Sequence, residues 1–176
     1  MEEKYDVSEV LISEQQLKDR VDELGAQITL DYYGKDLFLI GILKGSVPFM
    51  ADLMRRIDLP LEMDFMSVSS YGSATKSSGV VQIIKDLDSD IKGKDVLIVE
   101  DVIDTGLTLA YLKEYLLSRG PASVKLITML DKPSGRKVDI KSDYVGFEVP
   151  DKFIVGYGLD VDQKFRNLPY ISWVKQ

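Results

Sequence analysis

Two stretches of the chain are apolar without interruption, and a third is interrupted only by Lys125 and Thr128; such runs are typical of strands that are buried on both faces. They run from Leu37 to Leu43, from Val96 to Val99 and from Val124 to Leu130. Behind the first two stretches, apolar residues recur at helical spacing, and these residues are Met50, Leu53, Met54 and Ile57, then Leu109, Leu112, Leu116 and Leu117. Because strand and helix follow each other directly, the pattern predicts an α/β fold with a mostly parallel central sheet flanked by helices.

Weaker patterns predict the remaining elements. Residues 13–16 have the form of a capping box, with Ser13 as the cap, and Leu17, Val21, Leu24 and Ile28 follow at helical spacing. Shorter apolar or alternating runs predict strands at residues 61–65, 80–84, 144–149 and 153–158. No repeat or linker divides the chain. We therefore expect a single domain, residues 1–176, with a core at about 37–145 and a small hood from about 1–15 and 146–176.

Composition restricts the chemistry that this domain can perform. The 176 residues include neither cysteine nor histidine, and the formal net charge is −7. Disulfides, thiolate metal sites and cysteine nucleophiles are excluded, and proton transfer falls to Asp, Glu, Lys or Tyr. The acidic balance argues against nucleic acid as a partner. The N-terminal residues are too acidic for a signal peptide, and no apolar run approaches the ~20 residues that span a membrane. We expect a cytoplasmic protein with no membrane contact.

The second apolar stretch ends in an acid cluster, Glu100, Asp101 and Asp104. Ligands of parallel sheets bind at the carboxyl ends of the strands, where these carboxylates would repel one another. Residues 104–108, Asp-Thr-Gly-Leu-Thr, form a predicted loop before a helix, and such a loop suits a phosphate. A phosphate beside carboxylates requires either a divalent cation such as Mg²⁺ or sugar hydroxyls, and both indicate a phosphorylated sugar. A solvated strand end is the plainer interpretation, but it suits a lone Asp better than this cluster.

Further polar residues follow other predicted strands. Residues 44–46, Lys-Gly-Ser, come after the first stretch, where Ser46 can cap the next helix and free N–H groups beside a lysine favour an anion. Taken alone, they are more simply a generic strand-to-helix connection. Lys132 follows the third stretch, and Asp160 follows the strand predicted at 153–158. On one sheet edge, all of these side chains would converge.

One stretch between two predicted strands, residues 69–79, is rich in Ser and Gly. It predicts either an idle hairpin loop or a mobile lid over a site. Tyr71 in its midst favours the lid.

Residues 99–108, Val-Glu-Asp-Val-Ile-Asp-Thr-Gly-Leu-Thr, closely resemble the phosphoribosyl-pyrophosphate motif of the type I phosphoribosyltransferases. The acid at position 104 is similar to that of the 6-oxopurine branch, the hypoxanthine-guanine enzymes, whereas adenine and uracil enzymes generally carry Ala there and orotate enzymes Thr. The resemblance runs from about Val7 to Ile171. Its other matches are residues 43–46 with the family's pyrophosphate loop, Ser70 and Tyr71 with its lid, Lys132 with its purine-binding lysine, and 150–160 with Phe165 and Arg166 in its C-terminal hood.

This resemblance implies the type I phosphoribosyltransferase fold and a magnesium-dependent reaction. The 5-phosphoribosyl group would pass from phosphoribosyl pyrophosphate to N9 of hypoxanthine or guanine, giving IMP or GMP and pyrophosphate. By resemblance, Glu100 and Asp101 would hold the ribose hydroxyls with Mg²⁺ near them. Asp104 would be the catalytic residue, taking the proton from purine N7 or hydrogen-bonding it. The residues that would bind the 5′-phosphate are Asp104, Thr105, Gly106, Leu107 and Thr108.

The resemblance also assigns the two remaining subsites. Lys44, Gly45 and Arg166 would bind pyrophosphate, in a loop where the family often has a cis peptide before the lysine. Lys132 would donate to O6 of the base, which selects oxo over amino purines. The remaining purine contacts would be Phe153 stacking on the base, the Ile154 backbone at its edge, and Asp160, which would also hold a second Mg²⁺. Alone, Lys132, Phe153 and Arg166 would be taken for ordinary surface or core residues.

The family forms dimers and tetramers, so we expect a homodimer or homotetramer. Residues 43–57 are an interface candidate, although this helix could equally pack within the subunit. Three alternative functions differ from transfer to hypoxanthine or guanine. They are a regulatory RNA-binding protein on the same fold, a xanthine-preferring phosphoribosyltransferase and a phosphoribosyl-pyrophosphate synthetase. The net charge and Asp104 argue against the first, and the short chain without an ATP loop argues against the third. Nothing in the sequence ranks the three purines.

Overall fold

A six-stranded sheet forms the centre of the computed structural model, which describes residues 5–71 and 80–175. The strand order is β4-β3-β2-β5-β6-β7, and only β4 runs antiparallel to its neighbour among these described strands. The strands are β2 (Leu37–Leu43), β3 (Glu62–Tyr71), β4 (Val80–Lys85), β5 (Asp95–Ile103), β6 (Ser123–Asp131) and β7 (Tyr144–Glu148). The three apolar stretches of the sequence are β2, the start of β5 and most of β6, so the predicted mostly parallel sheet is confirmed.

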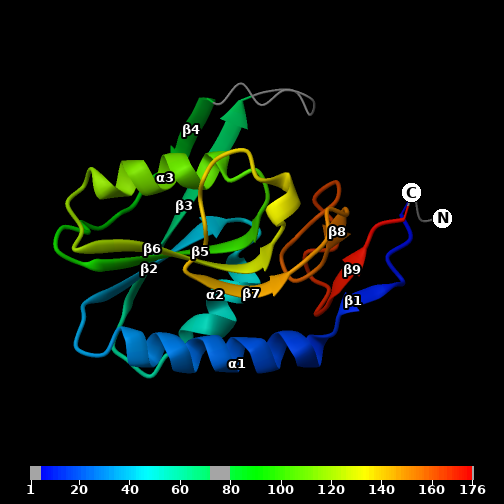
Figure 1. Cartoon of the computed structure of the whole chain (residues 1–176), viewed down its shortest axis with the longest axis horizontal. Helices are drawn as coiled ribbons and strands as arrows, with labels where there is room; N and C mark the ends of the chain where they lie inside the picture. Colours follow the sequence, from blue (N-terminus) through cyan, green and yellow to red (C-terminus); the bar gives the residue numbers. More distant parts are fainter. Residues whose placement is uncertain (1–4, 72–79, 176) are drawn as a thin grey trace.

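Helices cover both faces of this sheet (Figure 1). Helices α1 (Glu14–Asp31) and α2 (Val47–Met54) pack on one face, and α3 (Leu107–Leu117) packs on the other. Each face has its own apolar cluster, since alternate residues of the fully buried strands point to opposite sides. Leu39 lies in the α1–α2 cluster and Ile40 lies in the α3 cluster.

Helix α1 begins at the predicted capping box. The Ser13 hydroxyl accepts the Gln16 N–H at 3.1 Å, and the Gln16 side chain accepts the Ser13 N–H at 2.9 Å. Further along, the Arg20 guanidinium donates to the Gly146 and Val145 carbonyls of the edge strand β7 at 3.0 and 2.8 Å. These two bonds anchor the helix to the sheet.

A second, antiparallel sheet joins the two ends of the chain. It has the order β1-β9-β8, formed by β1 (Val10–Ile12), β9 (Ile171–Trp173) and β8 (Ile154–Val155). The sheet lies beside the main body, next to both termini (Figure 1). This is the small hood that was expected from the terminal segments, and it confirms that part of the predicted fold.

The order of the strands creates a switch point between β2 and β5. From β2 the chain passes through α2 to β3 on one side, and from β5 it passes through α3 to β6 on the other. The β2–β5 pairing ends at Gly41 and Val99, whereas β2 stays paired with β3 as far as Leu43 and Ser67. The two central strands therefore separate just where Glu100 begins, which is where ligands of open α/β sheets bind.

Three local predictions were wrong. Ser46 makes no side-chain cap on α2; its hydroxyl is buried without a hydrogen-bond partner in the described residues. The predicted loop at 69–79 starts too early, because β3 continues to Tyr71 in antiparallel pairing with β4. The strand predicted at 153–158 is only Ile154–Val155, since Gly156, Tyr157 and Gly158 have positive φ angles that end it.

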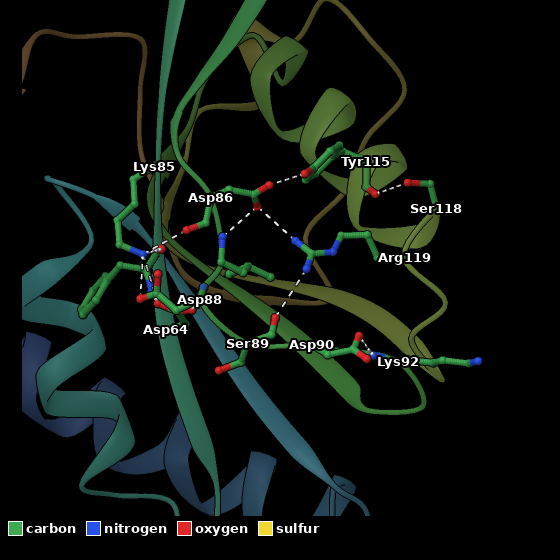
Figure 2. Close-up of polar contacts among 12 residues, drawn as sticks. Asp64, Lys85, Asp86, Asp88, Ser89, Asp90, Lys92, Tyr115, Ser118 and Arg119 are labelled. Atoms are coloured by element: carbon green, nitrogen blue, oxygen red, sulfur yellow. Dashed lines mark hydrogen bonds and ion pairs between the residues drawn. The ribbon is translucent and has the colours of Figure 1, made fainter.

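Polar contacts tie the loop after β4 to both β3 and α3 (Figure 2). On one side, Lys85 pairs with Asp64 of β3 at 3.3 Å. On the other, Asp86 accepts a hydrogen bond from the hydroxyl of Tyr115 of α3 and pairs at 3.1 Å with Arg119, which lies just after the end of that helix. These contacts therefore connect strands β3 and β4 to the C-terminal half of α3.

Within residues 5–71 and 80–175, none of the helices combines the length and the apolar character needed to cross a bilayer.

Candidate active site

A cavity of about 280 Å³ lies at the point where β2 and β5 separate. One wall comes from the end of β2 and the turn after it, and the other from the end of β5 and the loop that leads into α3. Seven of the residues predicted for the site line it, namely Gly45, Glu100, Asp101, Asp104, Thr105, Gly106 and Thr108. The sequence motif and the switch point of the sheet thus coincide in one cavity.

Glu100 and Asp101 are half-buried and lie within the last part of β5. The Asp101 N–H donates to the Glu100 carboxylate at 3.0 Å, and the Val102 N–H donates to the Asp101 carboxylate at 2.7 Å. Burial raises the pKa of the Glu100 carboxyl well above its ordinary range, and repulsion from Asp101 raises it further. Burial also raises the pKa of Asp101, while hydrogen bonds and the positive charge of Arg166 oppose that rise. Two ionised carboxylates are therefore unfavourable side by side at this position, and a bound cation would stabilise them.

Glu100→Gln is expected to stabilise the ligand-free protein at pH 8. A carboxyl whose folded-state pKa is raised binds its proton more tightly than in the unfolded chain, so stability falls as pH rises above the ordinary value of 4.5. The neutral amide escapes this loss, and the melting temperature should rise by about 2–4 °C, the shift that roughly 1 kcal/mol gives in a chain of this size. Thermal unfolding followed by circular dichroism measures the change.

The gain should shrink as the pH is lowered towards 4.5. Glu114→Gln, which removes the same charge from an exposed position on α3, is the matched control and should show no such pH dependence. Equal effects of the two substitutions would refute burial as the cause.

The segment from Asp104 to Thr108 connects the end of β5 to the first residues of α3. Gly106 precedes the helix with φ of +80°, and a side chain there would overlap Ile140, so glycine is required by conformation and by space. No side chain caps the helix, although the Thr105 hydroxyl accepts the Leu107 N–H at 3.4 Å. The first-turn N–H groups and the positive end of the helix dipole face the cavity edge, which suits a phosphate. Leu107 itself is half-buried at the start of the helix and does not line the cavity.

Asp104 is exposed, and its side chain lies against Gly135, where a Cβ atom would overlap the carboxylate. Its backbone carbonyl accepts a hydrogen bond from the Arg136 guanidinium at 2.8 Å, and the same guanidinium pairs with Asp131 at the end of β6. Gly135 and Arg136 had no predicted role. Both residues follow Lys132 closely in the sequence, just after the end of the predicted strand that places Lys132 at the site. This position is the indication that the sequence offers of their role.

The Lys44–Gly45 turn faces the acid pair. The Leu43–Lys44 peptide is cis, as the resemblance suggested. Gly45 is buried so closely against Asp101 that a Cβ atom would overlap the Asp101 carboxylate, and Gly158 of the hood packs against the Gly45 carbonyl in the same way. The Lys44 ammonium is exposed and donates to the Gln163 side chain at 3.3 Å.

Lys132 connects the sheet edge with the hood. Its N–H donates to the Ile103 carbonyl at 2.9 Å, which places the residue beside Asp104, and its ammonium donates to the Lys152 carbonyl at 2.7 Å. Phe153, the next residue, is 55% exposed despite its size, whereas Ile154 is buried in β8. An exposed ring beside a buried lysine is poor core packing but a suitable stacking surface.

Arg166 and Asp160 form an ion pair at 2.9 Å, and both are about one quarter exposed. Arg166 also donates to the Gly158 carbonyl at 2.7 Å. Asp160 was expected directly after the strand predicted at 153–158, which was wrong, because β8 ends at Val155 and Asp160 lies in a loop of the hood. Glu100, Asp101 and Asp160 do not gather with one another, since the described residues contain no group of three acids close enough to share one ion.

The predicted lid is only partly described. Ser70 and Tyr71 lie at the end of β3, paired with Val81 and Val80 of β4, and residues 72–79 lie outside the described residues.

A larger cavity of about 540 Å³ lies between α1, α2 and the hood. Its ionisable lining side chains balance, with Glu14, Asp22 and Asp52 against Lys18, Arg55 and Arg56. It contains none of the predicted site residues, and its balanced charge favours no ligand class.

Comparisons with known proteins show which family this chain is similar to. The family described as "Phosphoribosyl transferase domain" matches residues 8–162. The hypoxanthine-guanine phosphoribosyltransferase of Bacillus subtilis (strain 168) is 59% identical over 172 residues, 98% of this chain and 96% of that protein. A hypoxanthine phosphoribosyltransferase structure from Staphylococcus aureus matches with a TM-score of 0.94 at 55% identity, covering 97% of this chain and 92% of that one. A hypoxanthine-guanine phosphoribosyltransferase structure from Bacillus anthracis matches with a TM-score of 0.93 at 47% identity, covering 98% and 100%.

Proposed function

The chain belongs to the hypoxanthine-guanine phosphoribosyltransferases, and on that basis we propose that its reaction takes place in the cavity between β2 and β5. The enzyme transfers the phosphoribosyl group of phosphoribosyl pyrophosphate to a 6-oxopurine in purine salvage. One observation carries the placement of this reaction. The acid pair and the phosphate loop, which the sequence joins in one motif, line a single cavity at the switch point of the sheet.

The sugar phosphate lies along the end of β5. Glu100 and Asp101 accept hydrogen bonds from the ribose hydroxyls, and the loop from Asp104 to Thr108 holds the 5′-phosphate through its N–H groups and hydroxyls. Both acids already accept a backbone N–H, so their orientation is set before substrate arrives.

Magnesium fits the donor set. Glu100 and Asp101 are hard oxygen ligands, and burial makes them costly as neighbouring anions, so a divalent cation relieves both. Two carboxylates leave most of the coordination sphere to substrate oxygens and water, which is the usual arrangement for Mg²⁺ with phosphates. Asp160 would hold a second ion on the pyrophosphate side. The metal would neutralise charge on the phosphates.

The purine lies between the sheet edge and the hood. Lys132 donates to O6, Phe153 stacks on the ring, and the backbone of Ile154 together with Asp160 shapes the purine edge. Asp104 stands beside Lys132 and accepts the N7 proton as N9 attacks the sugar. With no histidine in the chain, a carboxylate is the natural base for this step.

Pyrophosphate leaves on the side of Lys44, Gly45 and Arg166. The two cations lie at the rim, and the Gly45 backbone approaches Asp101 closely. Negative charge builds on the leaving group in the transition state, and these cations stabilise it there. The lid that includes Ser70 and Tyr71 excludes water, which would otherwise hydrolyse the activated sugar.

Lys132→Ala is expected to raise KM for hypoxanthine about tenfold or more, since a hydrogen bond from a charged group is lost. KM for phosphoribosyl pyrophosphate should stay within twofold. Steady-state kinetics with each substrate varied in turn measures both. Lys137→Ala, an exposed lysine of the same segment, is the control. Equal weakening of both substrates would count against a base contact.

A single assay tests the proposed function and ranks its substrates. Hypoxanthine, guanine and xanthine are each supplied with phosphoribosyl pyrophosphate and Mg²⁺, and nucleotide formation is followed by absorbance. We expect turnover of hypoxanthine and guanine and its loss on chelation of the metal. Faster turnover of xanthine would favour the alternative of a xanthine-preferring enzyme, and no turnover of any purine would refute the proposal.

We also propose that the chain acts as one domain and assembles as a homodimer or homotetramer. The bond from Lys132 to the Lys152 carbonyl joins sheet and hood, which favours one cooperative unit. Residues 43–57 are the proposed contact between subunits. A cytoplasmic location is proposed because a chain without cysteine depends on no oxidising compartment.

A further inference from the structure

Gln163 lies between two of the proposed pyrophosphate-binding residues. Its side-chain oxygen, Oε1, accepts hydrogen bonds from the Lys44 ammonium at 3.3 Å and from the Arg166 guanidinium at 3.2 Å. Lys44 comes from the turn after β2, 119 residues away in the sequence. Two cationic side chains from separate parts of the fold therefore converge on one neutral oxygen atom.

The hood loop holds this oxygen in place. Val161 and Lys164 exchange backbone hydrogen bonds of 3.2 and 2.9 Å, which closes a tight turn around Asp162 and Gln163. Both turn residues have positive φ angles, 51° and 65°, a conformation that costs a residue other than glycine about 1 kcal/mol. The Gln163 N–H also donates to the Asp160 carboxylate at 2.9 Å. The loop thus holds Gln163 in an unfavourable backbone conformation, and the hydrogen bonds of the turn offset the energetic cost of that conformation.

Two positively charged side chains contact the amide oxygen of Gln163. The Asp160 carboxylate pairs with one of them, Arg166, whereas the Lys44 ammonium donates to the amide oxygen itself. The two bonds to this oxygen are longer than the 2.7–2.9 Å that is usual when a charged donor meets a charged acceptor. An oxygen atom that accepts hydrogen bonds from both a lysine and an arginine is in an environment typical of a phosphate oxygen. Here the oxygen belongs to a neutral amide, which a phosphate group can displace.

We propose that Gln163 is a positioning residue whose amide oxygen stands in for a pyrophosphate oxygen between turnovers. It keeps Lys44 and Arg166 directed at one point, competes weakly with pyrophosphate for both, and so eases the departure of that product. This inference rests on the proposed function, which places pyrophosphate at these two cations. The Gln163 side chain must be uncharged for this role, because a carboxylate in the same place would compete strongly with pyrophosphate for the two cations.

Two substitutions at this position should shift the inhibition constant of pyrophosphate in opposite directions. Gln163→Glu places a charged competitor between the cations and should raise that constant and KM for phosphoribosyl pyrophosphate about tenfold. Gln163→Met keeps the length without the oxygen and should lower the inhibition constant about threefold, the worth of a modest hydrogen bond. KM for hypoxanthine should stay within twofold in both variants. Product inhibition by pyrophosphate against phosphoribosyl pyrophosphate, with Mg²⁺ present, gives all of these values.

Asn167→Asp is the matched control, because it makes the same amide-to-acid change at an exposed site four residues away and should leave the pyrophosphate constant unchanged. A structural role for Gln163 would move both of its variants in the same direction, and that result would overturn the inference. So would values within twofold of the parent enzyme for both variants.

Lys44→Ala separates this inference from the proposed function. If Lys44→Ala weakens pyrophosphate binding while the Gln163 variants do not shift it, only the role of Gln163 is refuted. If Lys44→Ala leaves pyrophosphate binding unchanged, the proposed pyrophosphate site itself is wrong.

Discussion

Asp104→Asn should cut turnover by about 10²–10⁴-fold and leave binding of phosphoribosyl pyrophosphate nearly intact, if Asp104 is the base that receives the N7 proton. The side chain is exposed at the mouth of the cavity, and the loop conformation depends on the Asp104 carbonyl, which Arg136 holds at 2.8 Å. Asparagine keeps the size of the side chain and this backbone contact, so the phosphate loop should survive the change. Single-turnover kinetics and titration of phosphoribosyl pyrophosphate separate the two effects.

Asp139→Asn removes one negative charge from an exposed position near the same loop and should change neither quantity. If Asp104→Asn instead loses phosphate binding and keeps its turnover at saturation, the acid supports the loop and is not the base.

Gly45→Ala should lower kcat/KM for phosphoribosyl pyrophosphate by about 10²-fold. The added methyl group would overlap the Asp101 carboxylate, and the hood at Gly158 blocks movement of the turn away from it. A displacement of about 1 Å in a reactant-positioning group is enough for a loss of this size. The effect should fall on the sugar phosphate, with KM for hypoxanthine little changed.

Gly34→Ala separates this steric effect from the general cost of replacing glycine. Gly34 has a positive φ of 75° and open space around it, so alanine there should cost about 1 kcal/mol of stability and no activity per folded molecule. A loss below threefold for Gly45→Ala would mean that Asp101 does not need its present position.

Short-range patterns predicted the frame of the molecule well. The mainly apolar runs of β2, β5 and β6 are typical of strands buried on both faces in a globular protein, and that in turn requires helices on both sides. The Ser13–Gln16 capping box is equally local, because both of its hydrogen bonds span three residues. The acid cluster could be placed at a strand end for the same reason.

Features that depend on partners far along the chain could not be predicted in this way. Ser46 has the right residue type for a cap, but its place in the fold buries the hydroxyl away from the helix. Asp160 follows an apolar run, but positive φ angles at residues 156–158 end β8 early, so the acid lies in a loop of the hood and not at the end of a strand. The partners of Arg136 and Gln163 could not be read from the sequence, since their contacts with Asp104 and Lys44 cross 32 and 119 residues.

The pairing of the two chain ends in the small sheet has a consequence for the order of folding. Ser172 donates to the Glu9 carbonyl across 163 residues, and in the same region Val10 of β1 pairs with Ser172 of β9. Contacts between such distant segments form late, because the entropy of closing a long loop must be overcome first. The main sheet, whose neighbouring strands lie closer along the chain, can form before them. The chain should therefore assemble its sugar-phosphate cavity early and its purine-binding hood last, and partial unfolding should open the hood first.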